Sequence, residues 1–255
     1  MRAIRLVERN ALVYRRIWRG SFFGSFLQPT LFLFAIGVGL GGLIDLRGAS
    51  LPGGVDYLHF FAPGLLASSA MQTASFESSW PILGKFTWHR NYEAITSTPM
   101  VVTDLVLGEL GWIAVRQFIV ATAFLLVLTA FGIPRSPSAV LAIPAAMLTG
   151  LAFSAPIMAL AATMKTNGNF NVLFRFGITP LFLFSGIFFP LSRLPHWLQR
   201  VAWLTPLFHG VELVRGFILH TLSVSDGLAH AAFLAAMLVT GAIVATRTFR
   251  ARLEK

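Results

Sequence analysis

The sequence contains no cysteine and little charge. Only 12% of its 255 residues are Asp, Glu, Lys or Arg, and 56% are apolar, whereas an average soluble domain has roughly 25% charged and 45–50% apolar residues. The missing cysteines exclude disulfides, thiolate metal sites and thiol catalysis. Because so few charged side chains cannot cover a water-exposed surface, the composition indicates a protein embedded in a lipid bilayer.

Motifs for nucleotide and metal chemistry are missing as well. No Gly-x-x-x-x-Gly-Lys-Ser/Thr loop occurs, since Gly84-Lys85 is followed by Phe86 and lacks the upstream glycine. The six histidines show neither i, i+4 pairing nor an acidic partner suited to a metal ion. We therefore expect no catalytic residue, metal site or cofactor in this chain, and we expect any ATP and Mg²⁺ to be bound by another protein.

Six stretches are long and apolar enough to cross the bilayer as helices, which takes about 20 residues. They are Ser21–Ile44, Tyr57–Trp80, Leu105–Phe131, Ala139–Met164, Asn171–Phe189 and Leu228–Thr246. The region 190–220 is also apolar, but prolines, a glycine and charged residues interrupt it. Backbone broken in this way at membrane depth must be buried in protein or line water. The predicted fold is an all-α integral membrane protein with six transmembrane helices and short re-entrant helices between the fifth and sixth.

Basic residues are unevenly distributed about these spans. Fourteen of the 20 Lys and Arg fall at the two termini and in the loops that six spans place on one side. By the positive-inside rule that side is the cytoplasm, so both termini are predicted to lie there. The net charge of +10 then suits anionic lipid headgroups, and we expect no nucleic acid partner.

Residues 1–20 precede the first span and have an amphipathic pattern. Apolar side chains recur at three- and four-residue steps, while the arginines largely fall elsewhere; the apolar series is Ile4, Val7, Ala11, Tyr14 and Trp18. This pattern predicts a helix that lies in the cytoplasmic membrane interface. The residues assigned to the contact with lipid are Arg5, Arg9, Arg15, Arg16, Trp18 and Arg19.

Glu77 and Arg116 are the notable ionisable residues inside predicted spans. A charge at the bilayer centre costs roughly 2.5–3.5 kcal/mol on insertion scales, so such residues face the bundle interior or reach the interface. Both lie toward the cytoplasmic ends of neighbouring antiparallel spans. This placement predicts an intramembrane ion pair, with snorkelling of each side chain or a direct role in transport as alternatives.

The loop between the second and third spans also has a recognisable pattern. Tyr92–Thr96 fits a short helix that Pro99 prevents from continuing, and either Thr98 or Thr103 is placed to cap the third span. From these residues alone, a well-capped connector explains the loop as well as a functional role does.

The run Asn91–Glu109 resembles the coupling loop of the bacterial type-2 ABC exporter permeases, the group that includes the nodulation-factor and daunorubicin export permeases. Three further parts of the chain agree with that family in the same order. They are Gly37–Gly41, Tyr57–Glu77, and Phe184–Pro190 followed by Pro206–His209 and Arg215. The spacing of the last part is similar to the family's own signature, and the resemblance covers nearly the whole chain.

The resemblance implies a membrane-spanning permease subunit of an ATP-driven exporter, located in a bacterial plasma (inner) membrane. Such a subunit moves an amphipathic compound (a drug, a natural product, or a glycolipid or polysaccharide) out of the cytoplasm. It is not an enzyme; a separate ABC ATPase subunit hydrolyses the ATP. The resemblance further implies a second permease copy, which we expect to be identical, so that the pathway is formed by a homodimer.

The same resemblance assigns parts of this chain to roles. The N-terminal helix (1–20) and the loop 81–104 of the permease domain (21–255) receive the movement of the ATPase, and the region 190–220 lies near the exit. The coupling residues are Arg90, Asn91, Tyr92, Glu93, Thr98, Pro99 and Asp104. The residues of the exit region are Ser185, Gly186, Pro190, Pro206, His209 and Arg215.

Two other functions compete with this interpretation. A secondary transporter is expected to show broken spans in repeated halves and acidic residues at the bilayer midplane, but Glu77 is the only acidic residue well inside a predicted span. A membrane-embedded lipid-modifying enzyme needs acidic residues or histidines clustered at one membrane face. The ten carboxylates are scattered along the chain, which argues against this second function.

Overall fold

The computed structural model describes residues 2–40, 55–88, 91–166 and 168–254, and these residues form helices without strands. The elements in chain order are α1 (Arg2–Phe32), η1 (Leu33–Leu40), α3 (Tyr57–Glu77), α4 (Trp80–Thr87), α5 (Asn91–Thr96), α6 (Val102–Ala130), η3 (Pro137–Leu141), α7 (Ala142–Thr163), α8 (Gly168–Leu173), η4 (Phe174–Ile178), α9 (Thr179–Phe184), η5 (Leu191–Arg193), α10 (His196–Trp203), α11 (Pro206–Leu219) and α12 (Val224–Leu253). The predicted all-α fold class is confirmed for this part of the chain.

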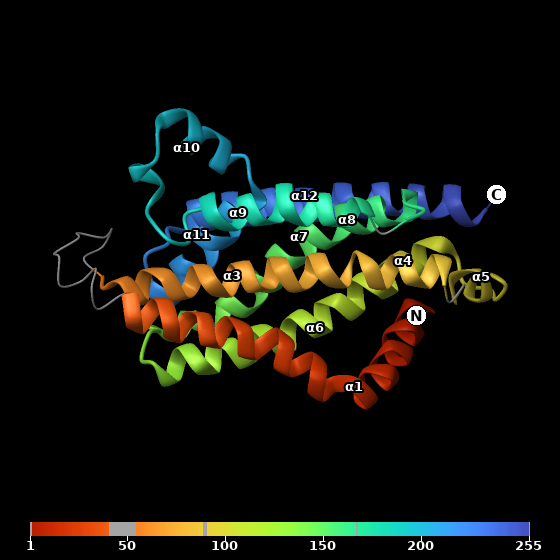
Figure 1. Ribbon diagram of the computed structural model, residues 1–255, viewed down its shortest axis with the longest axis horizontal. Coiled ribbons are helices and arrows are strands. Elements are labelled where there is room, and N and C mark those ends of the chain that lie inside the picture. Colours follow the sequence, from red (N-terminus) through yellow and green to blue (C-terminus); the bar gives the residue numbers. More distant parts are fainter. Residues whose placement is uncertain (1, 41–54, 89–90, 167, 255) are drawn as a thin grey trace.

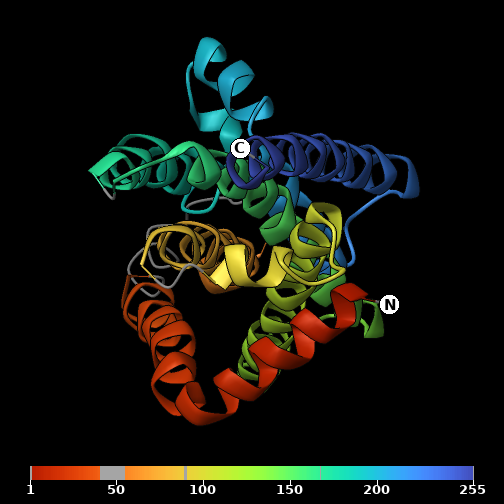
Figure 2. The ribbon, with the colours of Figure 1, turned by 90° about the vertical axis from the view of Figure 1, so that its right-hand side faces the viewer.

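The long helices run along the length of the molecule (Figure 1). Helices α4 and α5 lie at the end where both termini are found, and α11 lies at the opposite end. We call these the α5 end and the α11 end. Helix α10 projects sideways from the bundle (Figures 1 and 2).

Helix α3 is at the centre of the bundle, because 15 of its 21 residues are buried. It packs against α6, α7 and α11. Its hydroxyl groups turn back onto its own backbone: Ser68 Oγ donates to the Leu65 carbonyl and Ser69 Oγ to the Leu66 carbonyl, each at 2.9 Å. These contacts satisfy polar groups that would otherwise be costly to bury.

Three helical segments of the described residues are long and apolar enough to cross a membrane: Val102–Ala130, Pro137–Thr163 and Val224–Leu253. They correspond to the third, fourth and sixth predicted spans. The other three predicted spans fall on α1 with η1, on α3, and on the segment from α8 to α9. Helices therefore occur at all six predicted places, while the count of six membrane crossings stays a prediction.

Some predicted boundaries differ from the structure. Helix α1 is continuous from Arg2 to Phe32, so no break in the helix separates an interface segment of residues 1–20 from the first span, although α1 bends along its length (Figure 1). The fifth predicted span, Asn171–Phe189, is too long, because α9 ends at Phe184. The chain turns at Gly186, whose φ of 78° lies in the left-handed region that favours glycine.

The predicted caps of the third span are wrong. Helix α6 begins at Val102, and its N-cap residue Val101 makes no side-chain cap hydrogen bond. Thr98 instead donates its hydroxyl to the Ile95 carbonyl at 2.6 Å, which closes the end of α5. Neither Thr98 nor Thr103 therefore caps α6.

The buried apolar side chains form two clusters. The larger one is built mainly on α3, α6, α7 and α11. The other lies at the α5 end and contains Leu6, Phe86, Tyr92, Leu105 and Phe249, which come from α1, α4, α5, α6 and α12. At the α5 end the N-terminal helix, the short helices after α3 and the C-terminal helix thus share one core (Figure 2).

Candidate functional site

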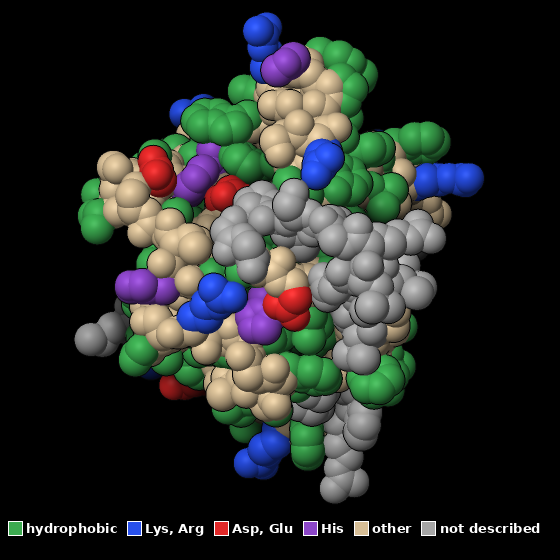
Figure 3. Space-filling model, turned by 90° about the vertical axis from the view of Figure 1, so that its left-hand side faces the viewer, with side chains coloured by type: hydrophobic (Ala, Val, Ile, Leu, Met, Phe, Trp, Pro, Cys, Tyr) green, Lys and Arg blue, Asp and Glu red, His purple; other side chains and the backbone are tan. Residues whose placement is uncertain are grey.

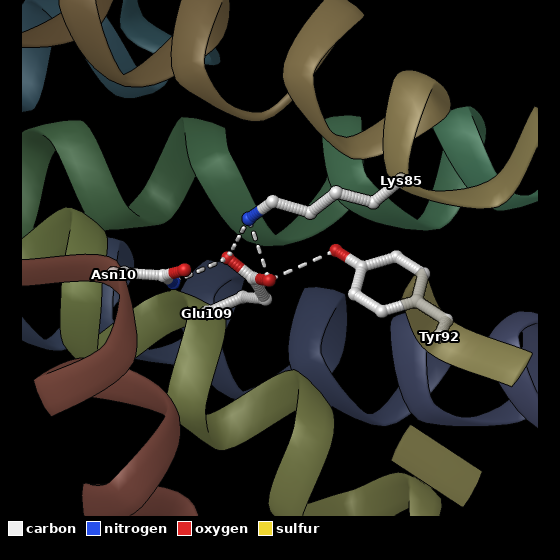
Figure 4. A network of polar contacts seen from close by, with 4 residues as sticks. All are labelled: Asn10, Lys85, Tyr92 and Glu109. Atoms are coloured by element: carbon white, nitrogen blue, oxygen red, sulfur yellow. Dashed lines mark hydrogen bonds and ion pairs between the residues drawn. The ribbon is translucent and has the colours of Figure 1, made fainter. Parts of the chain in front are cut away.

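A buried carboxylate lies at the centre of the α5 end. Glu109, in the second turn of α6, has a side chain that is 1% exposed. Its two carboxylate oxygens each lie 2.7 Å from Lys85 Nζ on α4. Tyr92 on α5 donates its hydroxyl hydrogen to Glu109 at 3.0 Å, and Asn10 on α1 donates from Nδ2 at 3.3 Å. Four helices therefore meet on one side chain (Figure 4), and we call these four residues the Glu109 junction.

The junction balances the cost of burying a charge. A carboxylate removed from water is tolerated when a cation and hydrogen-bond donors replace the lost hydration, and Lys85, Tyr92 and Asn10 supply them. Burial raises the pKa of the Tyr92 phenol well above its usual range, and the neighbouring Glu109 carboxylate raises it further. Tyr92 therefore keeps its proton and donates a hydrogen bond to Glu109. With its oxygens occupied in this way, Glu109 is suited to holding helices together.

Aromatic packing adds α12 to the junction. The ring of Tyr92 lies 4.6 Å from that of Phe86 and 5.6 Å from that of Phe249, between ring centroids. Arg252, one turn beyond Phe249, places its guanidinium 4.3 Å above the Phe86 ring. The last turn of α12 therefore packs directly on α4 and α5.

Arg252 also caps α7. Its Nη1 donates to the carbonyls of Ala161, Ala162 and Met164 at 3.2, 3.0 and 2.8 Å. The last carbonyls of a helix have no partner within the helix and carry its negative dipole end, so a guanidinium is well matched to them. This contact connects the end of α7 to the α12 turn that holds α4 and α5.

Helix α1 packs on the bundle by one face and leaves part of the predicted apolar series outside. Leu6 and Asn10 are buried, whereas Ile4 and Trp18 of the predicted apolar series are 58% and 46% exposed. The cause is a close approach to α6: a Cβ on Gly108 would lie 2.8 Å from Leu6 Cδ2, so the glycine sets which face of α1 is inside. The exposed apolar edge stays available to lipid, beside the exposed side chains of Arg5, Arg9, Arg15 and Arg16. The side chain of Arg19 lies outside the described residues.

Glu77 and Arg116 form an ion pair between α3 and α6. Arg116 Nη2 lies 2.9 Å from Glu77 Oε1, and the two side chains are 4% and 20% exposed. The Arg116 guanidinium also lies 4.4 Å from the centre of the Tyr14 ring on α1. Helix α1 thus meets a second buried charge one turn beyond Asn10.

The predicted coupling residues divide into inward and outward groups. Tyr92 is fully buried, Asn91 and Asp104 are half-buried, and Glu93, Thr98 and Pro99 are exposed. The carbonyl of Pro99 accepts a hydrogen bond from Arg2, which ties the start of α1 to this loop. Arg90 lies outside the described residues. Tyr92 therefore packs inside the bundle, and Glu93, Thr98 and Pro99 form the accessible surface of the loop.

The predicted exit residues gather at the α11 end around Arg215. This side chain is buried; its Nε donates to the Phe60 carbonyl at 3.2 Å, its Nη2 to the Gly186 carbonyl at 2.7 Å and its Nη1 to Glu212 Oε1 at 2.9 Å. Ser185 Oγ lies 3.5 Å from Thr205 Oγ1. Arg215 therefore holds the turn after α9 against α3 and α11.

The other exit residues mark where short elements start. Pro190 is the N-cap residue of η5, and Pro206 is the first residue of α11. His209 follows on α11 and contacts His230 of α12. A cavity of about 440 Å³ opens beside Arg215 and is also lined by Arg135 and Glu212.

Several residues of the α5 end were not assigned from the sequence. Glu109 was included in the coupling run without a role, and Lys85, Asn10, Phe249 and Arg252 were missed. The i, i+4 series Gly241, Ala245 and Phe249, all buried on α12, is the one local pattern that could have indicated a packed face there. The Lys85–Glu109 contact has no local signal, because 24 residues separate its partners.

Comparison with known proteins identifies close similarity over most of the chain. A family model described as ABC-2 type transporter matches residues 2–219. Nodulation protein J of Rhizobium meliloti (strain 1021) is 32% identical over 249 residues, which cover 96% of this chain and 92% of the relative. Nodulation protein J of Sinorhizobium fredii is 33% identical over 208 residues, covering 82% and 78%. The inner membrane transport permease YadH of Escherichia coli (strain K12) is 26% identical over 218 residues, covering 84% and 80%.

Proposed function

The chain belongs to the ABC-2 type transporter family as a membrane-embedded transport permease, and from this premise we propose that it exports an amphipathic compound with energy from a separate ATPase subunit. The family resemblance inferred from the sequence motifs is confirmed. The chain has no P-loop sequence of its own, which supports assigning ATP hydrolysis to a partner. The competing functions of secondary transporter and lipid-modifying enzyme have no comparable support.

One observation carries the proposed contact with the ATPase. Within the short helix α5, Tyr92 is 0% exposed and bonded to Glu109, while the next residue, Glu93, is exposed. The helix is therefore fixed to the bundle by one face and presents the other outward. A displacement applied to the outward face passes through Tyr92 to Glu109, and from there to α1, α4 and α6. These contacts favour the loop 81–104 as the receiver of ATPase movement.

The proposed topology has both termini in the cytoplasm of a bacterium. Figure 1 shows both termini at the α5 end, as an even number of crossings requires, and the arginine-rich N-terminus and C-terminus therefore share that side. Figure 3 shows the α11 end, where the few charged side chains are scattered among apolar and neutral ones. The Escherichia coli relative is named an inner membrane transport permease, which supports an inner membrane location.

The proposed pathway lies between two copies of the chain. The central helix α3 has 15 of 21 residues buried, so the interior of a single copy is filled by packed side chains around it. A passage wide enough for an amphipathic solute is therefore assigned to a surface shared with a second, identical permease. Within each copy, η5, α10 and α11 are the proposed short helices near the exit, and residues 1–20 the proposed interface segment.

The test uses the permease reconstituted in liposomes with an ABC ATPase subunit from the same organism. We expect Glu93→Ala to lower stimulation of ATP hydrolysis by roughly fivefold, which corresponds to about 1 kcal/mol, without lowering the amount of folded permease. The matched control is Glu254→Ala, which removes another exposed acidic side chain at the same end and should leave stimulation unchanged. Equal stimulation by the wild type and Glu93→Ala would refute the contact, and failure of any ATPase to bind would refute the exporter.

A further inference from the structure

Two histidines from different helices meet at the α11 end. His209 is in the first turn of α11 and His230 is in the second turn of α12, and their Nδ1 atoms lie 2.7 Å apart. The sequence gives no indication of this contact, since 21 residues separate them. A nitrogen–nitrogen distance this short requires a hydrogen between the two atoms, so one ring donates and the other accepts.

The backbone fixes which ring donates. His209 Nε2 lies 2.9 Å from the Trp203 carbonyl oxygen, which can only accept, so Nε2 carries a hydrogen. In its neutral form His209 therefore has a lone pair on Nδ1. His230 must donate from its Nδ1, which leaves its Nε2 as the atom that can take up a proton without disturbing the contact.

The pair thus tolerates one added proton and not two. Protonation of His230 at Nε2 preserves the hydrogen bond and makes it charge-assisted. A second proton, on Nδ1 of His209, would place two N–H groups against each other at 2.7 Å, and the contact would break. Two like charges this close also repel each other, which adds to the loss of the contact.

The surroundings offer little to stabilise a second charge. His209 is 2% exposed, and its ring stacks on Phe233 with the ring centroids 4.0 Å apart. Helix α7, which packs against both α11 and α12, contains no titratable residue. The charged groups of the surrounding elements have partners or are exposed. Asp226 of α12 contacts Ser223, Glu212 and Arg215 of α11 pair with each other, and Asp56 before α3 pairs with His59. Arg200 and His196 of α10 are exposed.

We propose that His209 and His230 form a proton-operated clasp between α11 and α12, closed with no added proton or one and open with two. His209 also donates from Nε2 to the Trp203 carbonyl, and because its protonated form keeps that hydrogen, α10 stays with α11 when the clasp opens. A cavity of about 390 Å³ between α7, α11 and α12 is lined by Phe217, Leu228 and Ala231 among other apolar side chains. Separation of α11 from α12 widens this cavity. The clasp thus makes the shape of the α11 end depend on pH.

The absence of cysteine allows a direct test on the full chain in lipid nanodiscs. Cysteines are introduced at the exposed positions Leu204, at the end of α10, and Leu228, on α12. Spin labels on them report the distance between these two segments by pulsed electron paramagnetic resonance. We expect the label distance of the otherwise native protein to increase between pH 7.5 and pH 4.5. No change over that range would overturn the clasp.

Two variants separate the clasp from general acid effects. In His230→Gln the amide can donate to a neutral His209 or accept from a protonated one, so the distance should stay short at both pH values. The matched control His220→Phe removes the histidine that follows α11 and contacts Ser138, and its response should equal that of the native protein. A native-like response in His230→Gln, or loss of the response in His220→Phe, would contradict the proposal.

Discussion

The two ends of the bundle are each held by a buried charge, but the two charges make opposite kinds of contact. At the α5 end the carboxylate of Glu109 accepts hydrogen bonds from side chains of three other helices. At the α11 end the guanidinium of Arg215 donates to two backbone carbonyls and to Glu212 on its own helix. Side chains can follow a moving helix by changing rotamer, whereas a backbone carbonyl moves only with its segment. The comparison indicates an adjustable joint at the Glu109 junction and a fixed fastening of the turn after α9 by Arg215.

The largest expected effect is at Lys85. Lys85→Ala leaves the buried Glu109 carboxylate without its cation, and removal of one partner of a buried pair costs about 3–5 kcal/mol. We expect a large loss of folded protein, measured by thermal unfolding of the detergent-purified permease. The control is the double change Lys85→Gln with Glu109→Gln, which removes both charges and should recover part of the loss. Equal stability of the single and double variants would show that the charge pair does not hold the junction.

Breaking the ion pair between α3 and α6 should cause the next largest loss of stability. Glu77→Gln or Arg116→Ala alone leaves a buried or half-buried charge without its partner, and we expect each to cost about 3 kcal/mol. Changing both residues should cost less than the sum of the two single changes, as a double-mutant cycle on unfolding free energies will reveal. If the loss of unfolding free energy in the double variant equals the sum of the two single losses, the two residues are not a coupled pair.

Arg215→Lys tests the fixed fastening. The lysine keeps the charge but cannot reach the Phe60 and Gly186 carbonyls together, because an ammonium lacks the planar fork of a guanidinium. Each buried carbonyl left without a donor costs about 1–3 kcal/mol. Hydrogen exchange should show the turn after α9 losing protection while the α5 end keeps it. Unchanged protection of this turn would mean that Arg215 does not hold it.

Tyr92→Phe should have the smallest effect on stability. The ring keeps its packing against Phe86 and Phe249, and one hydrogen bond to a charged acceptor is lost, which costs about 1.5–3 kcal/mol when fully buried. Because Lys85 and Asn10 still contact Glu109, we expect the low end of that range. A loss as large as that of Lys85→Ala would show that Tyr92 supports the fold and not the joint alone.

The sequence predicted the places of the helices better than their contacts. Apolar runs and the spacing of prolines located α6, α7, α12 and the short elements of 190–220, since these signals are local. The face by which α1 packs on the bundle was not predicted, because the close approach of Leu6 to Gly108 on another helix decides it. The caps at Thr98 and Thr103 were wrong because the Thr98 hydroxyl bonds to the end of α5 and α6 already begins at Val102, before Thr103. Contacts such as His209 with His230 depend on helices distant in sequence, and one sequence does not encode them in any local pattern.

The most direct test of the adjustable joint is the amount of solute transported per ATP hydrolysed by the reconstituted complex carrying Tyr92→Phe. Removing the Tyr92 hydroxyl cuts the bond between α5 and Glu109 and leaves the outward residues of the coupling loop in place. We predict that the ATPase binds and hydrolyses ATP as before, while transport per ATP falls several-fold. The same ratio of transport to hydrolysis in Tyr92→Phe and the wild type would contradict the role of the Glu109 junction in coupling.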